Sequence, residues 1–425
     1  MGTPWVAYGK PEVCEQVRSR IEDTAPTIGD TARLLVLAPY LTEATAPKLL
    51  ARAKTSSSAR TAVDLYLAIG LSRHASNLKR LRDEPRATRS ELRLGQAIAR
   101  FALGDGTLTG TIAKALYEGS LDERRATAHA LALMRQKRPQ IMLYDALQDP
   151  DPEVRLAAGR VHYPRRSRRA RRVLLELLER GEPAIRDDVA GLLVEHHHRF
   201  SSAAPLPDRL RGRVLVDTAV RSRSGARTAR VQLMSRDAVE RRAAFATLAG
   251  LGTYSVKTLG RLAAKPKARY GDVVDAELTM ALALMGDTAS IHALAKLEKV
   301  QAEAAAEVLF SFSGAKAPYS QLDFDHAASL ARAIEPWVVR GVVSQITQRR
   351  IYDALDRAES NAAAALARSR LAGPSGAGLA AAIRVLSEAG TTRDVPILIA
   401  VADRKVSVRV EGYAAAAAIC AASRQ

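Results

Sequence analysis

The apolar residues are spaced as in amphipathic helices along most of the chain. Positions three or four residues apart, which share one helix face, are repeatedly apolar or small, as in Val154, Ala158 and Val161 or in Ala128 and Leu131. Alternation with a period of two, which indicates β-strands, is hard to find. The pattern predicts an all-α protein.

Helix-breaking residues divide this pattern into pairs of helices, most clearly at 139–163. There an apolar-periodic segment ends at the run DPDP, residues 149–152, and a second helix follows. Asp151 can cap that helix, Pro152 suits its first position because proline lacks the N–H that is unpaired there, and Glu153 suits the positive end of the helix dipole. The same plan predicts helix pairs or second helices at 111–134, 171–196, 235–252, 271–287 and 394–419.

An arginine recurs near the start of the second helices at nearly constant spacing. It is present at Arg60, Arg93, Arg125, Arg155, Arg186, Arg242 and Arg409. The first four steps are 33, 32, 30 and 31 residues, and the next, of 56, is about two periods. Asp275 has the corresponding position 33 residues after Arg242. A fixed period in this range is typical of repeat architectures, in which one supersecondary unit is stacked many times.

These units resemble HEAT repeats, in the shorter bacterial form that also occurs in phycobilisome-lyase-like proteins. The similarity covers most of residues 50–425, and the stretch DPDPEVRLAAGRV is close to a consensus second helix. The resemblance implies an α-solenoid, a right-handed curved superhelix of stacked helical hairpins. The predicted organisation is an irregular helical cap at 1–50 and a solenoid over 51–425, with a distorted junction near 199–215 and weaker repeats at 290–400.

The resemblance also implies a structural role for the periodic arginines. In HEAT repeats of this type, the aspartate of the break and the arginine of the second helix form hydrogen bonds along the array as a ladder. Asp122 with Arg125, and Asp151 with Arg155, match that pattern. The predicted ladder residues are Asp122, Arg125, Asp151, Arg155, Arg186, Arg242 and Arg409.

The two cysteines bear on the compartment in which the protein works. Cys14 and Cys420 lie near opposite ends of the chain, and a stacked array holds its ends far apart, so we expect no disulfide between them. Unpaired cysteines favour a reducing compartment. There is no secretory signal, and no apolar run approaches the roughly 18 residues of a membrane span. The sequence therefore predicts a soluble, cytoplasmic protein.

Basic residues are concentrated in the middle of the chain. The net charge is +19, and residues 151–270 hold 26 Lys+Arg against 12 Asp+Glu, which leaves them at +14. Either an anionic partner or solvated, arginine-rich helix faces would explain this asymmetry. The candidate anion-binding residues lie in two runs: Arg165, Arg166, Arg168, Arg169, Arg171 and Arg172, then Arg209, Arg211 and Arg213.

No motif in the sequence predicts catalysis, a cofactor or a metal site. Adjacent residues on a helix point in different directions, so His196, His197 and His198 suit the negative end of a helix dipole better than a single metal. Phosphate-loop, zinc-protease and nucleophile-elbow motifs are absent. We therefore expect a protein without enzymatic activity.

Two binding functions are left. Most such solenoids bind proteins, and arginine forks pair well with carboxylates, so a non-enzymatic scaffold with a protein partner is the first hypothesis. The alternative is a nucleic-acid-binding solenoid whose arginine-rich middle third neutralises phosphates. HEAT-like DNA glycosylases for alkylated bases bind DNA in this way, but they place a tryptophan at the lesion, and Trp5 and Trp337 lie outside the basic region. Nothing marks the tetrapyrrole site of a bilin lyase.

Overall fold

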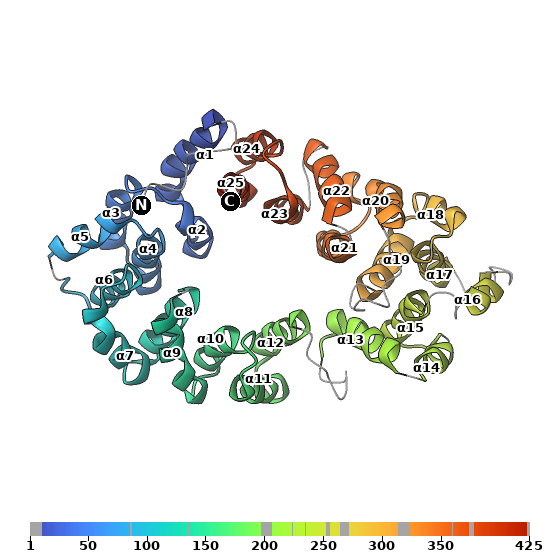
Figure 1. Cartoon of the computed structure of the whole chain (residues 1–425), viewed down its shortest axis with the longest axis horizontal. Coiled ribbons are helices and arrows are strands. Elements are labelled where there is room, and N and C mark those ends of the chain that lie inside the picture. Colours follow the sequence, from blue (N-terminus) through green and yellow to red (C-terminus); the bar gives the residue numbers. More distant parts are fainter. Residues whose placement is uncertain are drawn as a thin grey trace. The chain divides into compact units, whose positions relative to one another are not determined.

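In the computed structural model, all the regular secondary structure of the described residues is helical, as predicted (Figure 1). The structure describes residues 11–85, 87–134, 136–196, 206–222, 224–233, 235–251, 256–263, 272–312, 324–358, 360–373 and 378–422. These residues form 25 α-helices, and most of the contacts join neighbouring helices, as in stacked helical hairpins. The contacts divide the chain into two compact units, residues 1–196 with 402–425, and residues 197–401.

The first unit has two layers of helices (Figure 1). One layer holds the second helix of each pair: α2 (Thr31–Leu37), α4 (Ala59–Leu71), α6 (Ser90–Ala102), α8 (Leu121–Leu133), α10 (Pro152–His162) and α12 (Pro183–Glu195). The other holds the first helix of each pair: α1 (Pro11–Thr24), α3 (Thr45–Thr55), α5 (Ala75–Asp83), α7 (Thr109–Tyr117), α9 (Lys137–Asp145) and α11 (Arg168–Arg180). The last helix of the chain, α25 (Arg409–Ala422), also belongs to this unit.

The second unit repeats the pairing. Its second helices are α13 (Asp208–Arg221), α15 (Ala238–Gly250), α17 (Asp272–Leu284), α19 (Lys299–Phe312), α21 (Gln345–Ala358) and α23 (Leu379–Ala389). Its first helices are α14 (Gly225–Gln232), α16 (Val256–Ala263), α18 (Thr288–Leu294), α20 (Phe324–Val339) and α22 (Ser360–Ala372). The large side chains of Phe245, Trp337 and Tyr352 are buried in its core. Helix α24 (Val395–Arg404) leads back to the first unit.

The helix-start signals of the sequence act as predicted in α10. Asp151 is the N-cap and accepts hydrogen bonds from the N–H groups of Glu153 and Val154, and Pro152 is the first helical residue. The face that carries Val154, Ala158 and Val161 is buried. Because the cap pairs N–H groups that have no partner within the helix, the local sequence alone accounts for where α10 begins.

The two ends of the chain meet, and this corrects the prediction of unpaired cysteines. Helix α25 packs against α1 and α2, and a disulfide joins Cys14 to Cys420 with their Cα atoms 5.9 Å apart. Arg33 on α2 holds both carboxylate oxygens of Glu411 on α25, at 3.1 and 2.6 Å. The expectation that the ends lie far apart assumed that each helix pair packs only against its neighbours in the sequence. The contact between α1 and α25 joins helices from opposite ends of the chain, and no pattern of nearby residues encodes it.

The disulfide also removes the cysteine argument for a reducing compartment, since disulfides persist mainly in oxidising ones. Among the described residues, no helix has the length and the apolar character needed to span a bilayer.

Candidate functional site

The densest arginine run lies in the turn between α10 and α11 and in the first turns of α11. Ser167 N–H donates to the carbonyl of His162 at 3.3 Å, and the Ser167 hydroxyl caps α11 by accepting from Ala170 N–H at 3.2 Å. Arg166 has a φ of +63°, in the left-handed region that residues other than glycine rarely adopt. The backbone closes this turn by itself and places an arginine where glycine is usual.

Five arginines of this run are exposed, and four of them make up what we call the arginine cluster: Arg166, Arg168, Arg171 and Arg172. Within the part of the chain that the structure describes, their guanidinium groups form no hydrogen bond or ion pair. Nearby arginines differ, because Arg155 lies 3.1 Å from Glu176 and Arg160 lies 2.7 Å from Asp188. The arginine cluster is therefore a concentration of positive charge that the described residues do not neutralise.

The position of the arginine cluster is electrostatically unfavourable for α11. The N-terminus of a helix is its positive end, and a cation there costs about 0.3–1 kcal/mol at an exposed site. The first turn of α11 contains no acidic residue, whereas that of α10 contains Glu153. The helix is held instead by its apolar face, in which Val173, Leu174 and Leu177 are buried. The cations thus do not serve the stability of α11.

The other two arginines of the run contact their surroundings. Arg165 donates to the carbonyl of Val161, and the guanidinium of Arg169 lies over the ring of Tyr144 on α9, 5.1 Å from its centre. The Tyr144 ring meets the ring of His162 edge to face at 5.3 Å. Burial lowers the pKa of His162 below its ordinary value, although a backbone hydrogen bond at Gln140 acts to raise it; the nearby charge of Arg165 adds a smaller lowering. The rings of Tyr144 and His162 thus lie next to the arginine run.

The second predicted arginine run does not form a comparable surface. On α13, Arg211 pairs with Asp237 at 2.7 Å and with Asp208 at 3.1 Å. Arg213, which the sequence analysis grouped with the anion-binding candidates, has a side chain buried against α19, with its guanidinium 5.1 Å from the ring centre of Phe310. The side chain of Arg209 lies outside the described residues.

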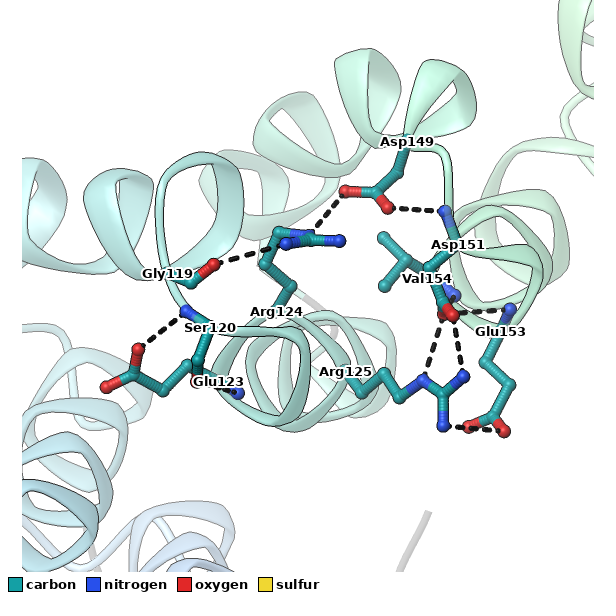
Figure 2. Close-up of polar contacts among 9 residues, drawn as sticks. All are labelled: Gly119, Ser120, Glu123, Arg124, Arg125, Asp149, Asp151, Glu153 and Val154. Atoms are coloured by element: carbon teal, nitrogen blue, oxygen red, sulfur yellow. Dashed lines mark hydrogen bonds and ion pairs between the residues drawn. The ribbon is translucent and has the colours of Figure 1, made fainter.

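One ladder arginine bridges two successive second helices (Figure 2). Arg125 on α8 donates to both carboxylate oxygens of Asp151, the N-cap of α10, at 3.1 and 2.6 Å. Next to it, Arg124 donates to Asp149 at 3.0 Å, and Asp149 accepts from the N–H of Asp151 at 2.8 Å. Burial alone would raise the pKa of Asp151, but hydrogen bonds from Arg125 and from Val154 N–H hold it below its ordinary value. The carboxylate is thus ionised and joins two repeats.

The other predicted ladder residues have different surroundings. Arg155 pairs with Glu176 on α11 and not with Asp151. Arg242 and its neighbour Arg241 both hold the fully buried Glu277 of α17, at 2.9 and 2.8 Å. Arg409 donates to the carbonyl of Ala402 at 3.3 Å. Asp122 and Arg186 have exposed side chains. Contact between successive helix pairs is thus made by several kinds of arginine pair.

Two further Arg–Asp pairs connect helices in a similar way, and the sequence analysis did not predict them. Arg211 donates to Asp237, the N-cap of α15, and Arg368 donates to both oxygens of Asp394, just before α24, at 2.6 and 2.9 Å. Each pair is 26 residues apart, as are Arg125 and Asp151. This constant Arg-to-Asp separation is present in the sequence and would have revealed them.

A groove of about 710 Å³ lies between α6, α7 and α8 of the first unit. Two of the arginines that line it are paired within the protein, because Arg82 and Arg100 both donate to Asp105, at 3.3 and 2.8 Å. A hydrogen bond from the Thr107 hydroxyl, with these two cations, holds the pKa of Asp105 far below its usual range. The groove consequently offers less unpaired charge than the arginine cluster does.

Of the two tryptophans, the structure describes Trp337. The indole N–H of Trp337 donates to the carbonyl of Leu294 at 3.0 Å and the side chain is fully buried, so it is not placed to contact a flipped base. Trp5, His197 and His198 lie outside the described residues. Within the described ranges, no group of three or more His, Cys, Asp or Glu side chains is placed to hold a metal ion.

No protein-family model matches the chain, and no curated protein matches it significantly.

Proposed function

We propose that the chain is a non-enzymatic scaffold, built of HEAT-like repeats stacked as a right-handed α-solenoid, that binds an acidic protein partner at the arginine cluster. The contacts between successive helix pairs support the repeat architecture. The observation that carries the binding proposal is the set of four exposed guanidinium groups that have no hydrogen bond or ion pair with any residue the structure describes. Arginine forks pair with carboxylates in two-point hydrogen bonds, which favours acidic protein segments.

The extent of the arginine cluster favours a protein segment over a nucleic acid. Arg168 and Arg172 are four residues apart on α11, which is about 6 Å along the helix axis. Tight binding to a duplex draws on several phosphates spread along the backbone, and the second arginine run does not lengthen the surface because Arg211 and Arg213 have internal contacts. A compact cluster of this size matches a few carboxylates of one short segment.

Nucleic-acid binding is the second candidate because of the charge outside the cluster. Residues 151–270 hold 26 basic against 12 acidic residues, and Arg227 and Arg230 on α14 are exposed. If the phosphate backbone is the ligand, exposed arginines outside the arginine cluster also bind it, and the affinity falls steeply with salt.

A quadruple variant with Arg166, Arg168, Arg171 and Arg172 changed to Ala tests the proposal. Its matched control removes four other exposed arginines that have no partner among the described residues: Arg60, Arg227, Arg230 and Arg236. Fluorescence polarisation is measured with a labelled oligo-glutamate peptide and with a labelled short duplex DNA, each over a salt series. We expect the quadruple variant to lose roughly tenfold or more in affinity for the peptide, since each exposed ion pair is worth up to about 1 kcal/mol and four are lost.

The control variant should retain its affinity for the peptide. Equal peptide affinity of the quadruple variant and the parent would falsify the proposal. Tight binding of DNA that both variants weaken, with a flatter salt dependence in each, would establish the second candidate in its place.

A further inference from the structure

Helix α9 carries an exposed apolar face beside the arginine cluster. Ile141 is 61% exposed and Tyr144 is 41% exposed, and their spacing of three positions along the chain places them on one side of the helix. Pro139, Met142 and Leu143 on the other sides are buried and hold α9 in place. The two outward side chains therefore do not contribute to the core of the unit.

This apolar face is continuous with charged and aromatic groups. On one side, the guanidinium of Arg169 lies over the Tyr144 ring. On the other, the hydroxyl of Tyr117, a residue that is 44% exposed, donates to the carbonyl of Met142 at 2.6 Å, so Tyr117 lies against α9. We call Tyr117, Ile141 and Tyr144, with Arg169 at their edge, the α9 patch.

We propose that the α9 patch and the arginine cluster form one binding surface for a short protein segment in which an aliphatic or aromatic residue stands next to several Asp or Glu residues. The inference rests on the proposed function and specifies its partner. Tyrosine and arginine are enriched among residues that dominate binding energy, and an apolar anchor supplies affinity that exposed ion pairs alone do not. The charge of the cluster determines the acidic character of the segment.

The charges around the patch also orient the segment. Asp145 lies near Tyr117, whose pKa it raises together with burial, so the Tyr117 side of the patch has a negative neighbour. The free guanidinium groups are all on the α11 side. The segment therefore binds with its acidic residues over α11 and its apolar anchor over Ile141 and Tyr144.

Selection from a random-peptide display library on the intact parent protein tests this inference. Each enriched peptide is then synthesised and its affinity is measured for the parent, for the Ile141→Ser/Tyr144→Ser variant, and for the quadruple arginine variant. Val231→Ser is the matched control, because Val231 on α14 is an exposed apolar residue (74%) in the other unit. Thermal melting of each variant verifies that it is folded.

The expected peptides contain an acidic run beside an aliphatic or aromatic residue. They should lose about tenfold in affinity for both the double and the quadruple variants, and none for Val231→Ser. Acidic peptides that require the arginines but bind the double variant as well as the parent overturn the inference and leave the proposed function standing. Failure to obtain any peptide that depends on the arginines overturns both, and DNA binding that requires the arginines points to a nucleic acid instead.

Discussion

The guanidinium of Arg125 on α8 donates hydrogen bonds to both carboxylate oxygens of Asp151, and the same Asp151 side chain caps the start of α10 (Figure 2). Asp151 thus has two roles: it caps α10, and it connects α10 to α8 of the preceding helix pair. The pairs Arg211 with Asp237 and Arg368 with Asp394 have the same separation of 26 residues. In two of the three pairs the aspartate, Asp151 or Asp237, is also the N-cap of its helix, so a helix-start signal that is local in the sequence also connects successive helix pairs.

The double role of Asp151 predicts unequal costs for removing the two partners. Arg125→Ala should lower the free energy of unfolding by about 1–3 kcal/mol, because a partly buried carboxylate loses its hydrogen bonds. Asp151→Ala should cost roughly 1 kcal/mol more, because the cap of α10 is lost as well. Chemical denaturation of the single variants and of the double variant measures both effects and the coupling between them. As a control, Arg60→Ala at an exposed position should change stability by less than about 0.5 kcal/mol. Independent, additive effects of the two substitutions would contradict the bridge.

The covalent link between the ends predicts that reduction destabilises the first unit. Breaking the Cys14–Cys420 disulfide frees a loop of 406 residues in the unfolded chain, and loss of a native disulfide typically costs about 2–4 kcal/mol. We expect a lower melting temperature for the Cys14→Ser/Cys420→Ser variant, and faster proteolysis in residues 402–422. Reductant should lower the melting temperature of the parent and leave that of the double-serine variant unchanged. Identical melting of the parent with and without reductant would show that the link contributes nothing.

The paired aspartates predict a loss of stability in acid. Burial alone would raise the pKa values of Asp151, Asp237 and Asp394, but hydrogen bonds and nearby arginines hold all three below their ordinary values. Because the folded-state pKa values are depressed, the stabilisation is complete above the unfolded-state pKa of about 3.9 and is lost as the pH falls through the lower folded values. Urea denaturation from about pH 6 to about pH 2 should show this decline. Asp151→Asn should be less stable than the parent near neutral pH and should show a shallower decline; parallel curves for the two proteins would exclude Asp151 as a source.

The arginine cluster predicts a substitution that weakens binding without a cost in stability. Replacing Arg168 and Arg171 with Ala removes two cations from the positive end of α11, and alanine is the best helix former. The free energy of unfolding should be unchanged or rise by up to about 1 kcal/mol. Differential scanning calorimetry of this variant beside Arg125→Ala separates the two classes of arginine. A marked drop in melting temperature would mean that the cluster has a structural role.

The sequence was enough to locate much of the candidate site along the chain, but it did not show which residues belong to that site. The run at 165–172 was visible as charge, and most of it is exposed in the structure. Arg213 was indistinguishable from it in sequence, yet it is buried against Phe310, because α13 packs its side against α19. The contribution of Ile141 and Tyr144 could not be read from the pattern either, since their exposure depends on what packs around α9.

By itself, the sequence determined the helices, their starts and their pairing. Periodic apolar faces, caps such as Asp151 and breakers such as the run DPDP act within a few residues, so their physical effect is present in the local sequence. Only the tertiary structure decided which arginines are neutralised and which are free, and that α25 returns to α1 and α2 so that Cys14 reaches Cys420. Those outcomes depend on contacts between residues up to 406 positions apart, whose free energy appears only after the helices have packed.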